Sequence, residues 1–372
     1  MLQKILEIER LDAYIVIGTL VLFGIIETLA GYLKRSKRTS SDWIQEAGSF
    51  FALSTLIHPF IVWVLFPAGD QLFPAAAHWM SGWNLALALA FYLFIDDVLQ
   101  YWYHRSAHEY PFLWKLHRAH HQAEEMGYFV SYRNAALYYL LMPNIWWVAL
   151  VTFWGGGKAI VLGLILKQIV IISAHSTVTW DKPMYTNRFL RPIVKVLERI
   201  IITPAFHHQH HGTSKLEGGE PNNNFGNMFS IWDQLFGTAV FRTNFPSKYG
   251  LPRPTQDTWA SAYLYPLVKS KDQQSELAPG FKHRDTTTPK PSQVTVTKGE
   301  KYLWCACGKS QSQPYCDGSH HGSKQTPVLY EAKRDGVVKF CNCKLTKKGP
   351  FCDNAHEQLL EKVEEKIEMN KA

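Results

Sequence analysis

The sequence predicts a mainly α-helical, multi-pass transmembrane bundle with histidine-bearing helices on its cytosolic side, followed by a small C-terminal α+β domain. Three observations lead to this prediction: long apolar runs in the first half, histidine clusters at or beyond the ends of those runs, and six cysteines confined to residues 305–352. The chain has 372 residues, 47% of them hydrophobic, which allows two or three domains and excludes general disorder.

The apolar runs account for the predicted membrane helices. The first, residues 11–33, is long enough to span a bilayer, and the basic residues 34–38 after it favour the cytoplasmic side. Its Glu27 is costly in lipid, so we expect this carboxyl near a helix end, neutral or paired. Further runs give four or five passes in all and cover residues 48–66, 83–103, 137–153 and 158–174. The clustered histidines then fall at or beyond cytoplasmic ends.

The charge of the chain indicates a lipid surface rather than nucleic acid. The formal net charge is +8, and the basic side chains lie next to the apolar runs instead of along one polar face. Such an arrangement favours anionic lipid headgroups, so the bilayer is an expected partner and nucleic acid is not.

The character of the chain changes after residue 240. We divide it into a membrane domain at 1–240, a proline-rich arm and linker at 241–292, a repeat domain at 293–356 and a closing helix at 357–372. In the repeat domain a Cys, Cys, His pattern recurs after 36 residues, which predicts two tandem copies of one small unit. The closing helix is predicted from the spacing of Leu359, Leu360, Val363 and Ile367 among charged residues.

Histidines dominate the chemistry of the membrane domain. On a helix, residues three and four apart share one face, so imidazoles at these spacings can converge on a metal ion. The clustered candidates are His104 and His108, then His117, His120 and His121, then His207, His210 and His211 with His208 between them. His175, at the end of the last apolar run, is a ninth candidate.

Eight or nine imidazoles exceed the roughly four to six ligands that one ion accepts, so two metal ions are implied. Imidazole suits iron, zinc, copper and nickel alike. We assign no metal role to His58, His78 or His283. Asp97, two helical turns before His104, could orient an imidazole or face water at the end of its helix.

The segment DVLQYWYHRSAHEYPFLWKLHRAHH and the later ITPAFHHQHH and NNNFGNMFSIWDQLFGT resemble the fatty acid hydroxylase and sterol desaturase superfamily over much of residues 80–240. The resemblance implies an integral membrane enzyme whose histidine boxes hold a diiron centre at the cytosolic face. It assigns the ligands to His104, His108, His117, His120, His121, His207, His210 and His211. The first box has three intervening residues, whereas the related carotenoid hydroxylases use four.

The cysteines form two similar sets, each of three thiols and one imidazole, which by ligand count could hold zinc or an iron-sulfur cluster. The sets are Cys305, Cys307, Cys316 and His320, then Cys341, Cys343, Cys352 and His356. Their spacing, ending in P-Y-C-D-G-S-H and P-F-C-D-N-A-H, resembles the CDGSH iron-sulfur family. That resemblance implies two [2Fe-2S] clusters, and a tandem copy lets one chain form the pair that single-motif relatives make as dimers.

Together these features predict an O₂-dependent oxidoreductase that hydroxylates or desaturates a fatty acyl, sterol-like or ether lipid, with electrons supplied by its own clusters. Redox clusters on the same chain favour iron over zinc at the histidine site. The chain has no G-x-G-x-x-G motif, so we expect a separate reductase. The alternative is a membrane-anchored redox sensor or cluster-transfer protein whose histidine domain is inactive or zinc-loaded.

Overall fold

The structure is a computed structural model that describes residues 2–213, 218–251, 257–269, 291–308, 310, 312–317 and 325–355, with side chains from residue 14 onward except those of residues 33 and 111. The chain divides into two compact units, residues 1–280 and 281–372. The predicted closing helix, His283, His320, His356 and half of the predicted linker lie outside the described residues.

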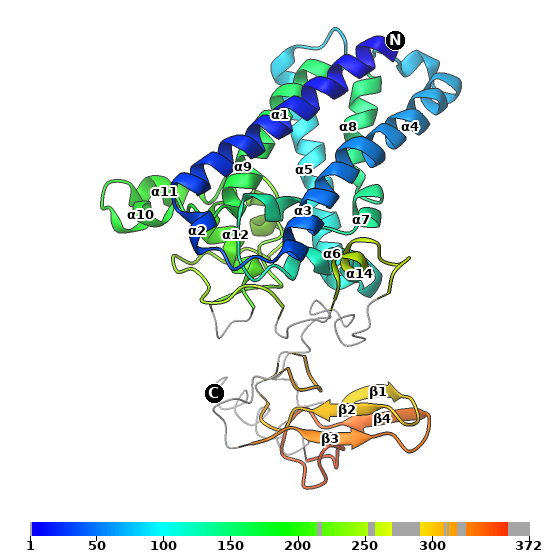
Figure 1. Ribbon diagram of the computed structural model, residues 1–372, viewed down its shortest axis with the longest axis vertical. Coiled ribbons are helices and arrows are strands. Elements are labelled where there is room, and N and C mark those ends of the chain that lie inside the picture. Colours follow the sequence, from blue (N-terminus) through cyan, green and yellow to red (C-terminus); the bar gives the residue numbers. More distant parts are fainter. Residues whose placement is uncertain are drawn as a thin grey trace, which may run out of the picture. The chain divides into compact units, whose positions relative to one another are not determined.

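Helices build the described part of the first unit (Figure 1). The longer ones are α1 (Leu2–Leu29), α3 (Ser40–Ala52), α4 (His58–Leu72), α5 (Leu85–Glu109), α6 (Pro111–His121), α8 (Pro143–Phe153) and α9 (Gly157–His175). The shorter ones are α2 (Tyr32–Arg35), α7 (Ala136–Leu140), α10 (Lys182–Thr186), α11 (Arg191–Leu197), α12 (Pro204–His211), α13 (Ile231–Leu235) and α14 (Trp259–Tyr263). A π turn (Leu53–Ile57) joins α3 to α4, and 3₁₀ turns cover Pro74–Ala76 and Tyr128–Tyr132.

Three helical segments are long and apolar enough to cross a membrane, within the residues that the structure describes: Ser40–Leu72, Leu85–Glu109 and Gly157–His175. Tyr14–Leu29 and Pro143–Phe153 are shorter apolar helices. The pass predicted over residues 137–153 is wrong as a single helix, because the chain breaks between α7 and α8. The 11 residues of α8 rise only about 16 Å, roughly half of a ~30 Å hydrocarbon core.

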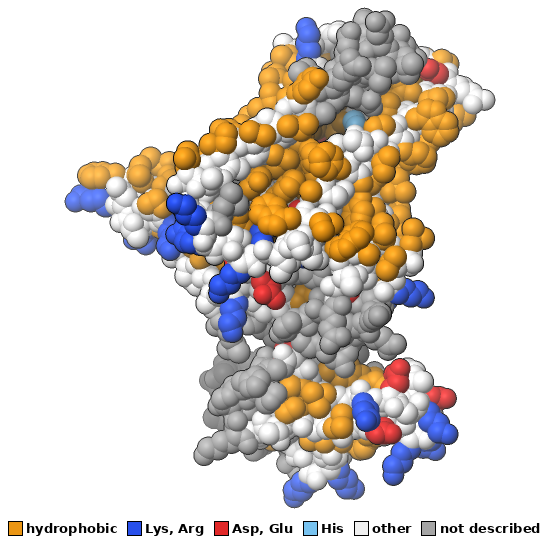
Figure 2. All heavy atoms as spheres, viewed as in Figure 1, with side chains coloured by type: hydrophobic (Ala, Val, Ile, Leu, Met, Phe, Trp, Pro, Cys, Tyr) orange, Lys and Arg blue, Asp and Glu red, His pale blue; other side chains and the backbone are white. Residues whose placement is uncertain are grey.

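Exposed apolar side chains cover the outer face of this unit. Figure 2 shows them over α1, α3 and α4, where Leu22, Phe51 and Trp63 are among the exposed residues. Because water would disfavour such a continuous apolar surface, it fits contact with lipid chains.

Close packing of α5 on α9 sets the spacing of the helices that reach the histidines. A Cβ atom added at Gly163 of α9 would lie 2.4 Å from the ring of Tyr92 on α5, so only glycine permits this approach. Glu27 lies near the end of α1, as expected, and is fully buried. Its carboxylate accepts hydrogen bonds from Ser176 Oγ at 2.7 Å, from the Thr177 amide at 2.9 Å and from the Tyr128 amide at 3.0 Å.

The segment after residue 240 is less extended than predicted. Thr258 caps the short helix α14 with a capping box, and α14 packs on α3 and α6. Tyr265 then joins the apolar core of the bundle. Part of the predicted arm is therefore a folded part of the helical unit.

Strands form the regular elements in the described part of the second unit. They are β1 (Ser292–Val296), β2 (Lys301–Trp304), β3 (Val328–Glu331) and β4 (Gly336–Phe340). β1 pairs antiparallel with β4, and β2 pairs antiparallel with β3. Each strand that precedes the first cysteine set therefore pairs with a strand that precedes the second set.

The 36-residue repeat in the sequence is also a repeat of hydrogen bonds. The Cys305 amide donates to Pro314 O at 2.9 Å, and the Cys341 amide donates to Pro350 O at 2.9 Å. Likewise, the amides of Cys316 and Cys352 donate to backbone carbonyls of β2 and β4. The two copies thus share one local fold and interlock through their strands.

Candidate metal centre

Two consecutive helices carry the first five imidazoles. α5 ends at Glu109 with His104 and His108 on its last turns, and α6 begins directly afterwards with Pro111 in its first turn. Proline suits this position because a first-turn residue needs no intrahelical N–H bond. α5 and α6 pack against each other, which brings the α6 histidines back toward those of α5.

The remaining imidazoles come from α9 and α12. His175 is the last residue of α9, and α12 packs against α9. The Thr203 hydroxyl caps the eight-residue helix α12 by accepting from the Phe206 amide at 3.4 Å. Every residue of α12 is buried, so its histidines face protein rather than water.

All nine predicted histidines gather in two buried groups. Within each group, one ring nitrogen per residue lies within 4.8 Å of those of the others. The first group holds five residues: His104, His108, His117, His121 and His210. The second holds four: His120, His175, His207 and His211.

The other described histidines stay outside these groups. His208 is buried beside them, but its Nε2 donates to Ser176 O at 3.1 Å and its Nδ1 accepts from the Tyr249 hydroxyl at 3.0 Å. Both of its ring nitrogens are therefore occupied. His58 and His78 belong to neither group, as expected.

Backbone carbonyls fix the tautomers of several of these rings. A carbonyl oxygen only accepts, so the ring nitrogen that faces it carries the proton. His104 Nδ1 donates to Phe225 O at 2.8 Å. His120 Nδ1 donates to Val130 O at 3.1 Å, and His210 Nδ1 donates to Asn223 O at 2.8 Å. His175 Nδ1 donates to Ile171 O at 2.8 Å in the same way.

In these rings Nε2 is therefore unprotonated and carries a lone pair, and such nitrogens face one another. His120 Nε2 lies 3.4 Å from His175 Nε2, although neither atom has a proton to donate in the neutral ring. Burial and the neighbouring His117 keep the pKa of His120 well below its ordinary value, so protonation does not relieve the contact. In the first group, Nε2 of His104, His117 and His210 is buried without a hydrogen-bond partner within the described part of the chain. Converging neutral donors of this kind fit metal cations.

The described cysteines of the second unit form no disulfides with one another, and four of them lie in two close pairs. Cys305 Sγ and Cys307 Sγ lie 3.7 Å apart, and Cys341 Sγ and Cys343 Sγ lie 3.4 Å apart. Cys316 and Cys352 complete the two predicted thiol sets and form no disulfide with a described cysteine. Thiols this close suit a shared metal or cluster, because thiolates packed together need a compensating cation.

Family models match both units. The fatty acid hydroxylase model matches residues 89–238, and the model of the iron-binding zinc finger of CDGSH type matches residues 280–321. The chain joins a fatty acid hydroxylase domain to a CDGSH domain.

Relatives of the hydroxylase domain are lipid-modifying enzymes. Alkylglycerol monooxygenase of Caenorhabditis elegans is 27% identical over 187 residues, which is 49% of this chain and 33% of that protein. Ornithine lipid hydroxylase OlsE of Rhizobium tropici is 29% identical and shares 43% of this chain and 44% of its own. Methylsterol monooxygenase 1-1 of Arabidopsis thaliana is 29% identical over 40% of this chain and 46% of its own. The chain thus spans less than half of each relative.

Among solved structures, the crystal structure of human mitochondrial inner NEET protein (MiNT)/CISD3 is 36% identical and covers 18% of this chain and 76% of that chain. Its TM-score is 0.18.

In the hydroxylase domain, Asp97 has a role that differs from both sequence expectations. It is 1% exposed, so it does not face water. Its carboxylate accepts hydrogen bonds from the Met228 amide at 3.0 Å, the Phe229 amide at 2.9 Å and Trp232 Nε1 at 2.8 Å, and among the described residues no imidazole donates to it. It anchors the segment whose Phe225 carbonyl holds His104.

Two residues that position the imidazoles were missed in the sequence. Asp233 accepts from the Phe225 amide at 2.8 Å and the Gly226 amide at 2.7 Å, so it fixes the same segment from the other side. Asn134 accepts from His117 Nδ1 at 2.9 Å. Asp233 lies within the NNNFGNMFSIWDQLFGT motif, which was a usable signal, whereas nothing about Asn134 distinguishes it in the sequence.

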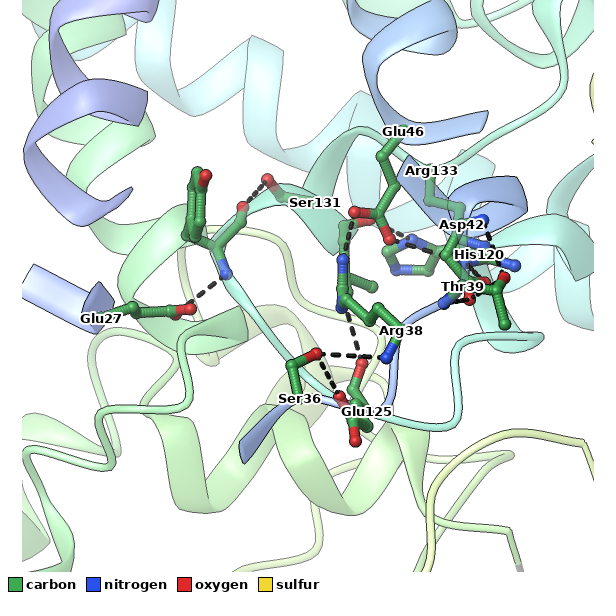
Figure 3. Close-up of polar contacts among 12 residues, drawn as sticks. Glu27, Ser36, Arg38, Thr39, Asp42, Glu46, His120, Glu125, Ser131 and Arg133 are labelled. Atoms are coloured by element: carbon green, nitrogen blue, oxygen red, sulfur yellow. Dashed lines mark hydrogen bonds and ion pairs between the residues drawn. The ribbon is translucent and has the colours of Figure 1, made fainter. Parts of the chain in front are cut away.

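A buried ion-pair network lies beside His120 (Figure 3). Arg38 was predicted to belong to a basic segment facing lipid headgroups, but its side chain is only 4% exposed and pairs with Glu46. Arg133 lies 3.5 Å from the same carboxylate and donates from Nε to Ala119 O at 2.9 Å. The network thereby ties α3 to the helix that carries His120.

A cavity of about 230 Å³ reaches both histidine groups. Its wall includes His104 and His117 of the first group and His120, His175 and His207 of the second, together with apolar residues such as Leu53, Val148 and Leu164. The cavity therefore connects the imidazoles with the interior of the helical bundle.

Proposed function

We propose that the protein is a membrane-bound diiron oxidoreductase that uses O₂ to hydroxylate or desaturate a lipid. The observation that carries this proposal is the pairing of two buried imidazole groups with a largely apolar cavity. The hydroxylase family match and the lipid-modifying relatives support it.

Each histidine group would hold one iron ion. Bound iron would supply O₂ activation for attack on a C–H bond. The chain's own residues keep the imidazoles in place: the Nδ1–H bonds of His104, His120 and His175 fix their tautomers and ring planes. Burial of the groups excludes bulk water, and the apolar cavity wall positions the lipid chain.

Hydroxylation in this scheme converts R–H and O₂, with two electrons and two protons, into R–OH and one water molecule. We propose that the electrons come from two [2Fe-2S] clusters, one bound by Cys305, Cys307, Cys316 and His320 and the other by Cys341, Cys343, Cys352 and His356. The family match at residues 280–321 supports the first cluster, and the repeated hydrogen bonds support the second. A tether holds donor and acceptor at an effective concentration of order mM.

A separate reductase would reload the clusters. The basic residues 34–38 would place both metal sites and the CDGSH domain on the cytoplasmic side, where thiols stay reduced.

Metal content and lipid oxidation together test the proposal. The purified full-length protein should contain roughly six irons per chain, two of them at the histidines and four in the clusters. His207→Ala should abolish lipid oxidation and release histidine-bound iron, while the cluster absorbance stays unchanged. His208→Ala is the matched control on the same helix, since both nitrogens of His208 are engaged elsewhere. Zinc or no metal at the histidines, with intact clusters, would instead indicate a redox sensor or cluster-transfer protein.

The electron route has its own test. Cys316→Ala should slow turnover with the physiological reductase and leave turnover with an artificial small-molecule reductant in place. Equal rates with the physiological reductase in both proteins would refute the proposed donor.

A further inference from the structure

Regularly spaced residues of α5 and α9, most of them polar, line the cavity beside the imidazoles. On α5, Asp96, Gln100 and His104 all line the cavity at intervals of four residues, and Lys167, Ile171 and His175 do so on α9. Residues four apart lie on one helix face about 6 Å apart along the axis. Gln100 therefore lies one helical turn further into the bundle than the imidazoles. Asp96 and Lys167 lie two turns further in.

Ionised groups at this depth of a candidate membrane span are costly and mark functional sites. Lys167 Nζ pairs with Asp96, and the side chains are 6% and 0% exposed. The pair has no net charge, so the cavity wall presents a polar, charge-balanced ion pair at this level. A free carboxylate or a quaternary ammonium group would bring an unbalanced charge there, which disfavours charged lipid headgroups.

Two amide oxygens at the same cavity have no donor. Gln100 is 7% exposed and Asn144 is 8% exposed, and neither Gln100 Oε1 nor Asn144 Oδ1 has a hydrogen-bond partner among the described residues. An unpaired buried acceptor costs about 1–3 kcal/mol. A purely apolar occupant would leave both oxygens unsatisfied, whereas a hydroxyl group can donate to one of them.

We infer that the cavity selects a neutral lipid bearing a hydroxyl group, which donates to Gln100 or Asn144 about 6–12 Å from the carbon that is oxidised. This inference rests on the proposed function for the oxidised carbon, and the hydroxyl preference itself concerns binding alone. Gln100 and Asn144 are then the residues that determine specificity.

A binding comparison tests the inference on the full-length protein in detergent. The probes are 1-hexadecanol, hexadecane and palmitate, supplied at equal concentration, and the lipid that co-purifies is measured by mass spectrometry. We expect the wild type to retain hexadecanol at least about tenfold better than either other probe, the factor that one well-placed hydrogen bond supplies. Gln100→Leu should reduce the preference over hexadecane below about threefold and leave hexadecane retention unchanged.

Asn144→Leu provides a second variant if Gln100→Leu fails to fold, and Leu164→Met is the control because it changes an apolar residue of the same cavity. Equal retention of hexadecanol and hexadecane by the wild type, or an unchanged preference in both leucine variants, would overturn the inference. If the preference holds but no lipid is oxidised, the proposed function fails and the binding inference stands. If alcohols and hydrocarbons bind and react equally, the binding inference fails and the proposed function stands.

Discussion

Replacing Asn134 should loosen one of the two iron ions proposed for the histidine groups. Asn134 is 4% exposed, and its Oδ1 accepts the Nδ1–H of His117 at 2.9 Å. Asn134→Ala leaves that N–H buried without an acceptor and frees the ring to rotate. Loss of such a partner weakens metal binding about 10- to 100-fold, which corresponds to ~1.4–2.8 kcal/mol. Because His117 belongs to the five-imidazole group, only the ion in that group should be affected.

The assay is chelator competition on the purified protein, with iron counted by elemental analysis and cluster iron followed separately by absorbance. The wild type should lose its histidine-bound iron over one chelator range, and Asn134→Ala should release one ion at a chelator concentration about 10- to 100-fold lower. Asn134→Asp keeps an acceptor oxygen at the same place, so it should retain both ions. Parallel loosening of both ions in Asn134→Ala, or of neither, would refute the division into two groups.

Three further predictions concern stability and can be checked by thermal or denaturant unfolding in detergent. Asp233→Asn should destabilise the hydroxylase domain by about 1–3 kcal/mol, since an amide NH₂ would face one of two buried backbone donors; an unchanged midpoint would contradict this. Arg38→Met should cost up to about 3–5 kcal/mol, because the buried Glu46 loses its hydrogen-bonded partner and keeps only the 3.5 Å contact with Arg133, and the double variant with Glu46→Leu should regain most of the loss. Trp304→Phe should cost about 1 kcal/mol in the CDGSH domain by removing the bond from its Nε1 to Cys341 O, with the helical unit unaffected.

The sequence predicted the membrane helices where apolarity alone decides the outcome. Three predicted runs became helices long enough to cross a bilayer. The run over residues 137–153 is just as apolar, yet it is broken ahead of Pro143. Hydropathy measures how favourable burial is and does not show whether the helix is continuous. A count of apolar residues therefore cannot predict the break.

The burial of charged residues was harder to predict. Glu27 was correctly expected near a helix end because a carboxylate in lipid needs donors, and the structure supplies them from two segments distant in sequence. Arg38 looked like a headgroup-facing residue because its neighbours are basic. Its partner Glu46 lies eight residues further along the chain, on α3, and only the fold of α3 against the segment of Arg133 shows that both are buried.

The sequence by itself determined which residue types form the site. Helical spacing places each histidine cluster on a limited arc, and nine imidazoles exceed the capacity of one ion, so the sequence alone predicts a two-metal arrangement. The tertiary structure decided the division between the two groups. His120 and His121 are adjacent in sequence, as are His210 and His211, yet each pair is split between the groups. Adjacent helical residues point about 100° apart, so which ring meets which depends on how α5, α6, α9 and α12 pack, a set of long-range contacts that no local spacing encodes.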